Sequence, residues 1–477
     1  MRFSDFIDGG RIAAGGLQDF ATGLLHPTLR LGVTGLSRSG KTVFITALVH
    51  ALLKGARMPM FEAHAKGRIT RCYLEPQPND DLPRFAYEEH LAALTGENRH
   101  WPEGTRRISQ LRLTFEYEPQ GFLARRFHGG KLHVDIVDYP GEWLLDLPLM
   151  TQSYQQWSSA TIAMAKKPPR LTHAAPWLEL LKNIKSNDPQ NEMKALEIAT
   201  DFTAYLARCR ESDVSLSTLP PGRFLMPGDL AGSPLLSFAP LDITADEILA
   251  PNSLAAIMAR RYDSYVLKVV KPFFHSHFSR LDRQIVMVDV LSSLNAGAAA
   301  VADLQQALNE VLSCFRIGEN SLLSELFGRR VERLLFAATK ADQLHHTDHD
   351  QLENILRTLI ETTTHSAEAS GARHDVAALA SIRSTREAKV TQKGQEIPCI
   401  VGTPMAGEQI GKTVFDGEKE AAVFPGDLPK QASAALDGQA EGKLHFVRFR
   451  PPANIGESFP HIRLDRAIEF LLGDRFA

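Results

Sequence analysis

One stretch decides the fold of this chain: Gly35-Leu36-Ser37-Arg38-Ser39-Gly40-Lys41-Thr42. It matches the pattern G-x-x-x-x-G-K-[ST] in full, and it lies between two apolar runs, at residues 29–34 and 43–53. This order predicts a strand, a loop and a helix. The two glycines let the loop curl so that its N–H groups and the helix N-terminus point at a bound phosphate. The alternative interpretation is a Gly/Ser turn that fits the pattern by chance.

Each residue of this loop receives an expected role. Lys41 would reach the outer phosphates of a nucleotide, and the Thr42 hydroxyl would ligate Mg²⁺. The residues expected to surround the phosphates are Leu36, Ser37, Arg38, Ser39, Gly40, Lys41, Thr42 and Val43. A second Gly-Lys-Thr, at residues 411–413, has only three residues between its glycines and no helix pattern after it. We interpret that segment as a turn between strands.

Another motif, Asp138-Tyr139-Pro140-Gly141, follows the mostly apolar run at residues 132–137. A carboxylate at the C-terminal end of a strand beside a phosphate loop is where Mg²⁺ needs an outer-shell partner. Asp138 is therefore the predicted metal partner. Gly141 is predicted to offer an unhindered N–H to the terminal phosphate.

The base of the nucleotide is indicated by Thr339-Lys340-Ala341-Asp342, which follows a strand predicted at residues 334–338. An aspartate can accept two parallel hydrogen bonds from N1–H and N2–H of guanine, whereas adenine presents the opposite pattern on that edge. The stem of Lys340 would lie along the base. Each short motif is a weak signal alone, but the order of the motifs along the chain favours guanine.

A further loop is expected to complete the base site. The strand predicted at residues 377–384 should end in a loop whose N–H groups meet guanine O6. The candidates are Ser381, Ile382 and Arg383, which are chosen from their place in the chain because such a loop has little sequence signature.

This ordered set resembles the Ras-like GTPases of the P-loop class, with Thr339 standing where their usual Asn stands. Several segments resemble one bacterial group more closely, the YcjX-like family of GTP-binding proteins. Those segments are residues 35–42, Asp138-Tyr139-Pro140-Gly141-Glu142-Trp143, residues 221–228, and residues 339–342 followed by His345-His346. The resemblance runs from about residue 1 to the C-terminus. It implies an α/β fold, a mostly parallel sheet with helices on both faces, and a loose association with envelope or general stress responses.

The first switch is expected in the long connection at residues 56–107, which is rich in Pro, Asp and Arg. In GTPases of this shape, a Thr just before the first hairpin strand closes over Mg²⁺ and the terminal phosphate. Thr105 stands at that place, so it is the predicted switch threonine and a metal ligand. Ser109 and Thr70 are its rivals.

The expected reaction is hydrolysis of GTP at the β–γ bond by a water that attacks in line. Glu142 follows Gly141, where Ras-like enzymes place a Gln. Its carboxylate could orient the water, but it would repel the phosphate unless it is partly protonated or turned away. We therefore expect slow turnover, with any fast rate needing a partner, a dimer or an added arginine. Arg38 is a candidate for that arginine, or it is an ordinary exposed side chain of the loop.

Two other functions compete with this one. The first is a GTP-gated scaffold, in which bound GTP orders the switches and an inserted region engages another protein, with negligible catalysis. The second is an ATP-using kinase or ATPase, which requires Asp342 to be incidental. All three share the phosphate loop.

Composition sets the frame for these predictions. The chain has 477 residues, an apolar share of 44% and a formal net charge of −3, which indicate two or three globular cores and give no sign of nucleic-acid binding or of a polybasic membrane contact. The scattered cysteines are typical of a cytoplasmic protein with reduced thiols; they are Cys72, Cys209, Cys314 and Cys399. The chain shows no apolar stretch near the roughly 20 residues that span a bilayer, and no signal peptide.

The spacing of the motifs predicts a nucleotide-binding domain interrupted by additions. The predicted parts are a lead-in helix packed on that domain rather than on a membrane surface (1–27), the first part of the domain (28–164), a helical insertion (165–281), the second part of the domain (282–390), a small β-rich extension (391–440), and a strand and helix that close the domain (441–477). The insertion would serve as an arm that binds a protein partner, or as a lid.

A group of polar residues after Asp342 permits two interpretations. His345, His346 and His349, with Asp348 and Asp350, resemble a metal-ligand set. They also lie just before a predicted helix, where polar capping residues are expected. We favour capping.

Overall fold

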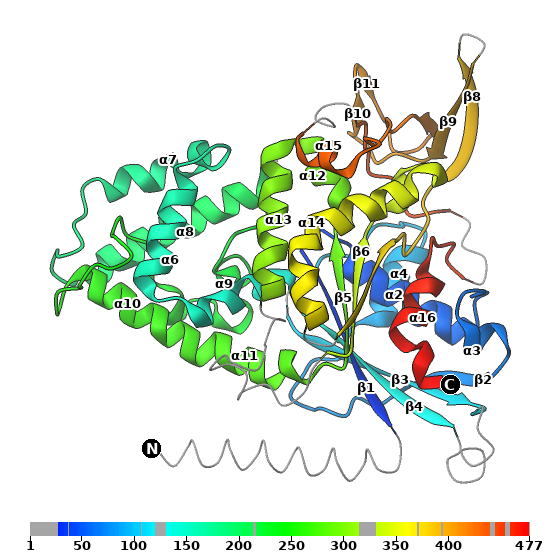
Figure 1. Cartoon of the computed structure of the whole chain (residues 1–477), viewed down its shortest axis with the longest axis horizontal. Coiled ribbons are helices and arrows are strands. Elements are labelled where there is room, and N and C mark those ends of the chain that lie inside the picture. Colours follow the sequence, from blue (N-terminus) through cyan, green and yellow to red (C-terminus); the bar gives the residue numbers. More distant parts are fainter. Residues whose placement is uncertain are drawn as a thin grey trace.

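The computed structural model of this protein describes residues 27–36, 38–105, 107–119, 130–212, 216–313, 331–369, 372–392, 395–438, 444–453 and 458–476 (Figure 1). The predicted lead-in helix lies outside the described residues except for its last position, and Ser37 of the phosphate loop also lies outside them.

A seven-stranded sheet forms the centre of the described chain. Its strands are β1 (Thr28–Gly35), β2 (Ile69–Glu75), β3 (Ser109–Tyr117), β4 (Lys131–Asp138), β5 (Arg283–Val288), β6 (Arg333–Ala338) and β7 (Arg373–Ala378). The strand order is β2-β3-β4-β1-β5-β6-β7. Strands β4, β1, β5, β6 and β7 run parallel, and β2 and β3 join antiparallel at one edge. The predicted α/β class with a mostly parallel sheet is confirmed.

Helices cover both faces of this sheet (Figure 1). The helices outside the large insertion are α2 (Lys41–Lys54), α3 (Glu62–Ala65), α4 (Tyr87–Thr95), α12 (Val290–Ala296), α13 (Ala298–Ser313), α14 (His349–Ala369), α15 (Ala432–Leu436) and α16 (Leu464–Leu472), with the short turns η7 (Ala341–Gln343), η8 (His346–Asp348) and η9 (Gly473–Phe476). Neighbouring strand residues point to opposite faces. Ile285 packs in the core that holds α2 and α16, whereas Val286 packs in the core that holds α13 and α14.

The region between β4 and β5 is helical and extends to one side of the sheet, on the left in Figure 1. It contains η1 (Gly141–Thr151), α6 (Tyr154–Ala165), α7 (Arg170–Leu181), α8 (Glu192–Glu211), α9 (Gly222–Leu225), η2 (Gly228–Leu230), η3 (Pro234–Leu236), α10 (Leu254–Tyr265), the π-helical η4 (Val266–Val270), α11 (Lys271–Ser276) and η5 (Phe278–Arg280). We call α6 to α11 the helical region.

Aromatic side chains form the core of the helical region. Trp157 of α6 stacks on Tyr262 of α10, with ring centroids 5.2 Å apart, and it also contacts Phe202 and Phe238. Ser153 caps α6 in a capping box, which fixes where this helix begins. Helix α6, which the sequence placed at the end of the first part of the domain, thus packs with α8 and α10.

A small β-rich extension lies above the sheet (Figure 1). Its strands are β8 (Arg386–Gln392), β9 (Gln395–Gly402), β10 (Gln409–Ile410), β11 (Thr413–Val414) and β12 (Ala421–Val423). The second Gly-Lys-Thr forms the tight turn between β10 and β11, where Gly411 has a φ of 58°, as the sequence predicted. The strand expected after residue 441 is absent from the described residues there: residues 444–448 carry no ladder, and Phe449 makes one isolated bridge to Pro404.

Among the described residues, none of the helices combines the length and the apolar character that crossing a bilayer requires.

Candidate nucleotide site

The sequence motifs lie together at one edge of the sheet. Gly35 ends β1 and Asp138 ends β4, and Val33 pairs with Asp138 across these parallel strands. Thr339 follows the last residue of β6 directly. The carboxyl ends of parallel strands point the same way, and open α/β sheets bind their ligands at that edge. The fold therefore gathers residues that are far apart in the sequence.

The phosphate loop turns sharply between β1 and α2. Gly40 has a φ of 85°, which favours glycine, and helix α2 begins at the next residue, Lys41. The Lys41 side chain is buried, and its Nζ donates a hydrogen bond of 3.0 Å to the carbonyl of Gly35. Leu36 and Ser39 are buried, whereas Arg38 is exposed and has a φ of 61°. The helix N-terminus thus faces the carboxyl edge of the sheet.

Thr105 connects the two residues that were predicted to meet at Mg²⁺. Its hydroxyl donates to Asp138 Oδ2 at 2.5 Å and lies 3.3 Å from the hydroxyl of Thr42. The rival Thr70 is exposed and bonds the carbonyl of Glu116, far along β3 from this corner. We call Thr42, Thr105 and Asp138 the metal corner.

Asp138 carries the clearest sign of a missing partner. Burial raises the pKa of Asp138 to about 6, against the lowering effects of the Thr105 hydrogen bond and the Lys41 charge. Its second oxygen, Oδ1, is buried without a hydrogen-bond partner among the described residues, and so are the hydroxyls of Thr34 and Ser39. Buried polar atoms are almost always paired, so the unpaired Asp138 oxygen indicates a ligand. The Asp138 carboxylate and the hydroxyls of Thr42 and Thr105 are oxygen ligands that suit a hard cation such as Mg²⁺.

Gly141 packs directly against the phosphate loop. A Cβ atom on Gly141 would lie 1.7 Å from the carbonyl oxygen of Gly35 and 3.3 Å from Lys41 Nζ. Only glycine permits this approach, which brings the Gly141 backbone beside the lysine. Glu142 is buried in η1 next to it. The structure therefore brings Gly141 and Glu142 to the phosphate end of the site, and it leaves the Arg38 side chain in solvent.

The proposed base end of the site holds another buried carboxylate, Asp342. Its Oδ2 accepts hydrogen bonds from both the N–H and the hydroxyl of Ser384, which fix its orientation. Burial raises the pKa of Asp342, and the Ser384 bonds oppose that rise. Lys340 takes the left-handed conformation, with a φ of 61°, and pairs with Asp289. Thr339 donates its hydroxyl to the carbonyl of Val288 at 3.2 Å.

The predicted loop after β7 lies near Asp342, because Ser384, which directly follows the loop, bonds the Asp342 carboxylate. Ser381 and Ile382 are buried, and Ile382 packs with Ala47 of α2. Arg383 donates from its backbone N–H to the carbonyl of Pro460 and from its Nε to that of Thr385. The Arg383 N–H is therefore already engaged with another loop, which leaves Ser381 and Ile382 as the remaining candidates.

Sequence reasoning missed two residues of the base end, Ser384 and Asp289. Ser384 follows the predicted loop by one position, and nothing in its local sequence marks it as the partner of Asp342. Asp289 directly follows β5. The rule that selected Asp138, a carboxylate at the end of a strand, would also have selected Asp289.

Comparison with known proteins identifies the family of this chain. The model of the YcjX-like family, DUF463, matches residues 29–476. This chain belongs to the YcjX-like family. The Ras-like GTPase YcjX of Escherichia coli is 38% identical over 461 residues, which cover 94% of this chain and 96% of that protein. The Ras-like GTPase YcjX of Shewanella oneidensis is 34% identical over 482 residues, which cover 95% of this chain and 96% of that protein.

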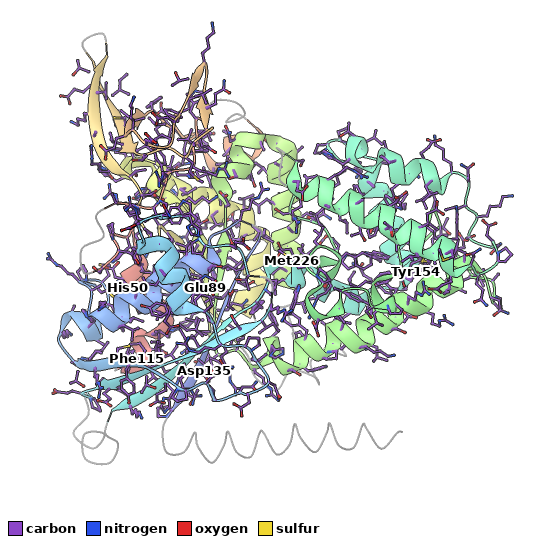
Figure 2. The ribbon with its side chains drawn as sticks, turned by 180° about the vertical axis from the view of Figure 1, so that it is seen from behind. His50, Glu89, Phe115, Asp135, Tyr154 and Met226 are labelled. Carbon is purple, nitrogen blue, oxygen red and sulfur yellow. The ribbon has the colours of Figure 1, made fainter. Side chains whose placement is uncertain are left out.

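One YcjX-like signature, residues 221–228, had no chemical role in the sequence. In the structure it lies against η1, where the helical region meets the sheet. Trp143 donates its indole N–H to the carbonyl of Met226, which Figure 2 shows near that junction. The guanidinium of Arg223 lies 3.1 Å above the Trp143 ring. This YcjX-like signature therefore joins the segment after Gly141 to the helical region.

Proposed function

We propose that this YcjX-like protein binds GTP or GDP together with Mg²⁺ at the carboxyl edge of its sheet and hydrolyses GTP slowly to GDP and phosphate. The metal corner carries the proposal: Thr105 contacts both Thr42 and Asp138, while one buried Asp138 oxygen keeps no partner among the described residues. The name Ras-like GTPase, which both relatives bear, supports the same chemistry.

The residues of the chain divide the work at the phosphate end. Thr42, Thr105 and Asp138 would hold Mg²⁺, which neutralises charge on the phosphates when it is bound. The Lys41 ammonium, whose Nζ already lies at the loop, would give up its hydrogen bond to the Gly35 carbonyl and donate to the phosphate oxygens instead. The Gly141 N–H would reach the terminal phosphate. Lys41, Thr42 and Asp138 are buried before the ligand arrives, and such preorganisation favours electrostatic stabilisation of a transition state.

Guanine is the proposed base because Asp342 is held ready for it. A carboxylate whose orientation is fixed by Ser384 can accept the two parallel hydrogen bonds that guanine donates. Lys340, held by Asp289, would lie beside the base. Ser381 and Ile382 would offer N–H groups to guanine O6, as the sequence predicted.

Turnover is proposed to be slow because the phosphate end lacks an obvious group to orient water among the described residues. Glu142 occupies the place that follows Gly141 and is buried in η1. A carboxylate there repels the phosphate when it is charged. Arg38 is exposed, so it would need to fold back over the loop to act. A switch that resets slowly agrees with both facts, and the link to stress responses stays a prediction from the family.

A nucleotide-gated scaffold is the second candidate, and the contacts of η1 favour it. Trp143 and Asp146 of η1 both bond the signature at residues 221–228, through Met226 and Gly222. A change at Gly141 on nucleotide binding would therefore be passed to the helical region. In that case the helical region would bind a protein partner in one nucleotide state, and hydrolysis would serve only as a reset.

The test compares the two Gly-Lys-Thr segments of the chain. Lys41→Ala should weaken GTP binding about tenfold to hundredfold and abolish phosphate release, since hydrogen bonds to charged groups contribute about 1.5–3 kcal/mol each. Lys412→Ala is the matched control, because Lys412 lies in the turn between β10 and β11. Calorimetry and a phosphate-release assay measure both. Equal GTP binding by the two variants would remove the proposal.

Competition between ATP and GTP separates the remaining alternatives. GTP should displace a labelled guanine nucleotide at far lower concentration than ATP, and Asp342→Ala should remove that difference. A wild type that holds both nucleotides equally well would favour an ATPase. Tight GTP binding with no phosphate release above that of Lys41→Ala would favour the scaffold.

A further inference from the structure

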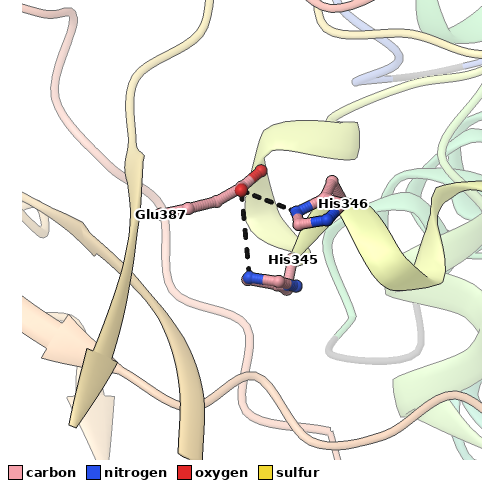
Figure 3. Close-up of side chains that lie close together, drawn as sticks. All are labelled: His345, His346 and Glu387. Atoms are coloured by element: carbon pink, nitrogen blue, oxygen red, sulfur yellow. Dashed lines mark hydrogen bonds and ion pairs between the residues drawn. The ribbon is translucent and has the colours of Figure 1, made fainter.

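Two histidines and a glutamate converge beside the base end of the site (Figure 3). His345 and His346 follow η7, and Glu387 comes from β8 of the extension. Glu387 Oε2 lies 2.7 Å from His346 Nδ1 and 3.8 Å from His345 Nε2. All three of these atoms lie within 4.8 Å of one another. The fold therefore gathers a possible ligand set from two distant segments.

The structure divides the polar group that the sequence had considered as a metal site. His349 is buried and bonds the carbonyl of Ala341 through Nε2 at 2.9 Å. Asp350 pairs with Arg463 at 2.6 Å. His345 and His346 turn toward a common point, and their third partner is Glu387, which the local sequence pattern did not include.

Neighbouring side chains orient both the buried His345 and the Glu387 carboxylate. His345 Nδ1 lies 3.0 Å from the hydroxyl of Thr347, and Glu387 Oε1 lies 3.2 Å from the guanidinium of Arg383. Metal ligands in proteins are characteristically oriented by such outer partners. When Nδ1 of His345 donates to Thr347, its Nε2 presents a lone pair to the Glu387 carboxylate. A cation between these two groups converts a repulsive contact into an attractive one.

We propose that His345, His346 and Glu387 form a binding site for a divalent transition metal of the Zn²⁺ class. Two imidazoles and one carboxylate are a donor set of open zinc sites, whereas Mg²⁺ prefers oxygen ligands. Tetrahedral ligands about 2.0 Å from zinc are about 3.3 Å apart. The two measured separations, 2.7 and 3.8 Å, lie on either side of that value. The His346 side chain is 62% exposed, so a fourth position is open to water.

A metal at this site would link the segment that holds Asp342 to the segment that holds Ser384. Asp342 precedes His345 by three positions, and its partner Ser384 precedes Glu387 by three. A bound metal would thus hold the carboxylate and its orienting serine in one arrangement. This consequence rests on the proposed function, whereas the metal site itself does not.

The experiment is a calorimetric titration of ZnCl₂ into the nucleotide-free full chain, without an affinity tag. The wild type should bind Zn²⁺ with one site per chain. His346→Ala and Glu387→Gln should each weaken binding by at least about tenfold, the loss typical of removing even an outer partner of a metal site. Thr347→Ala should weaken it about tenfold for the same reason.

Matched controls keep the result specific. His445→Ala and Glu396→Gln remove an exposed histidine and an exposed glutamate of the same half of the chain, and they should bind Zn²⁺ as the wild type does. Lys41→Ala should also bind Zn²⁺ normally, which separates this site from the nucleotide proposal. Equal affinity in every variant would identify an adventitious ion only and would overturn the proposal, as would the absence of binding by the wild type.

A spectroscopic readout is independent of stability. Co²⁺ in a four-coordinate nitrogen and oxygen site absorbs strongly in the visible region. That band should appear in the wild type and in Glu396→Gln and be lost in Glu387→Gln, with excess Mg²⁺ leaving it unchanged. A band that survives in Glu387→Gln would show that the glutamate is not a ligand and would overturn the assignment.

Discussion

Two aspartates of one segment, Asp138 and Asp146, are both wholly buried, and burial raises the pKa of each to about 6. Their surroundings differ. Asp146 Oδ1 accepts the N–H of Gly222 at 2.7 Å, and its Oδ2 accepts the hydroxyl of Tyr265 at 2.6 Å. Asp138 Oδ2 accepts the hydroxyl of Thr105, while its Oδ1 is left unpaired by the described residues. Both oxygens of Asp146 therefore have hydrogen-bond partners, whereas only one oxygen of Asp138 has a partner among the described residues.

This difference separates a structural carboxylate from a ligand-binding one. A raised pKa shows only that a group is buried, because desolvation disfavours the charged form at either place. The unpaired oxygen is the more informative sign, since folded proteins seldom leave a buried acceptor without a donor. Asp146 joins η1 to the helical region, whereas Asp138 faces the phosphate loop. Substitution should therefore affect stability at one position and ligand binding at the other.

The largest effect is expected from Asp138→Asn. The amide cannot supply the negative charge that Mg²⁺ requires, so Mg²⁺-dependent GTP binding should weaken by about hundredfold, which corresponds to about 2.7 kcal/mol. The unfolding midpoint of the nucleotide-free protein should not fall, because the substitution removes a buried charge whose second oxygen lacked a partner. Titration of GTP with and without Mg²⁺ measures the first effect, and thermal denaturation measures the second. A variant that keeps the full Mg²⁺ effect would show that Asp138 is not a metal partner.

Asp146→Asn should give the opposite result. The amide oxygen can keep the Gly222 N–H, but the NH₂ group then faces Tyr265, whose hydroxyl hydrogen loses its acceptor. That costs about 1–3 kcal/mol of unfolding free energy. The ratio of GTP affinities with and without Mg²⁺ should equal that of the wild type. Denaturant unfolding and the same titration test this pair of outcomes, and a changed ratio with unchanged stability would reverse the assignment of the two aspartates.

The contrast between these residues also shows what sequence can predict. Asp138 was found because a local pattern, an apolar run that ends in Asp-x-x-Gly, places a carboxylate at a strand end. The same kind of pattern selected the phosphate loop and Asp342, and apolar runs marked several strands of the sheet, but the strand order came only from the structure. Such patterns depend on neighbours in the chain, so they are visible in one sequence.

The partners of these residues were not predictable in the same way. Tyr265 lies 119 positions from Asp146, and Ser384 lies 42 positions from Asp342. Glu387 is equally remote from His346. Serine, tyrosine and glutamate are common, and nothing in the local sequence selects one of them as a partner. Contacts of this kind are fixed by packing of the helical region and the extension against the sheet, which a single sequence does not reveal.

A pH series sharpens the comparison because burial raises the pKa of both aspartates alike, whereas only Asp138 is proposed to bind the metal. The folded pKa of each, about 6, lies above the ordinary value of 3.8. Their stabilising contribution is therefore complete below that ordinary value and is lost as the pH rises through about 6. Between these two pKa values, each aspartate should lower the free energy of unfolding by up to about 1.4 kcal/mol for every unit by which the pH rises.

Mg²⁺ binding should respond in the opposite direction. It requires the charged form of Asp138, so the Mg²⁺-dependent part of GTP affinity should fall up to about tenfold per pH unit below about pH 6. Asp138→Asn should lose this pH dependence, and Asp146→Asn should keep it. Because protonation of the nucleotide affects both variants equally, the difference between them reports on the protein carboxylates alone. A wild-type Mg²⁺ effect that is constant from pH 7 to pH 5 would contradict the role of Asp138.

The smallest effect is expected at another buried carboxylate, Asp342, which combines features of the other two because Ser384 holds one of its oxygens and guanine is its proposed ligand. Ser384→Ala removes the hydroxyl that bonds Asp342 Oδ2 but keeps the backbone N–H that bonds the same atom. Losing one such bond costs about 0.5–1.5 kcal/mol, so the preference for GTP over ATP should fall about threefold to tenfold. Thr385→Ala is the matched control, because its hydroxyl bonds the Asp342 carbonyl rather than the carboxylate. Competition binding with both nucleotides measures the preference. An equal loss in the two variants would mean that Ser384 supports the loop as a whole, whereas a loss confined to Ser384→Ala would show that it aims the carboxylate at the base.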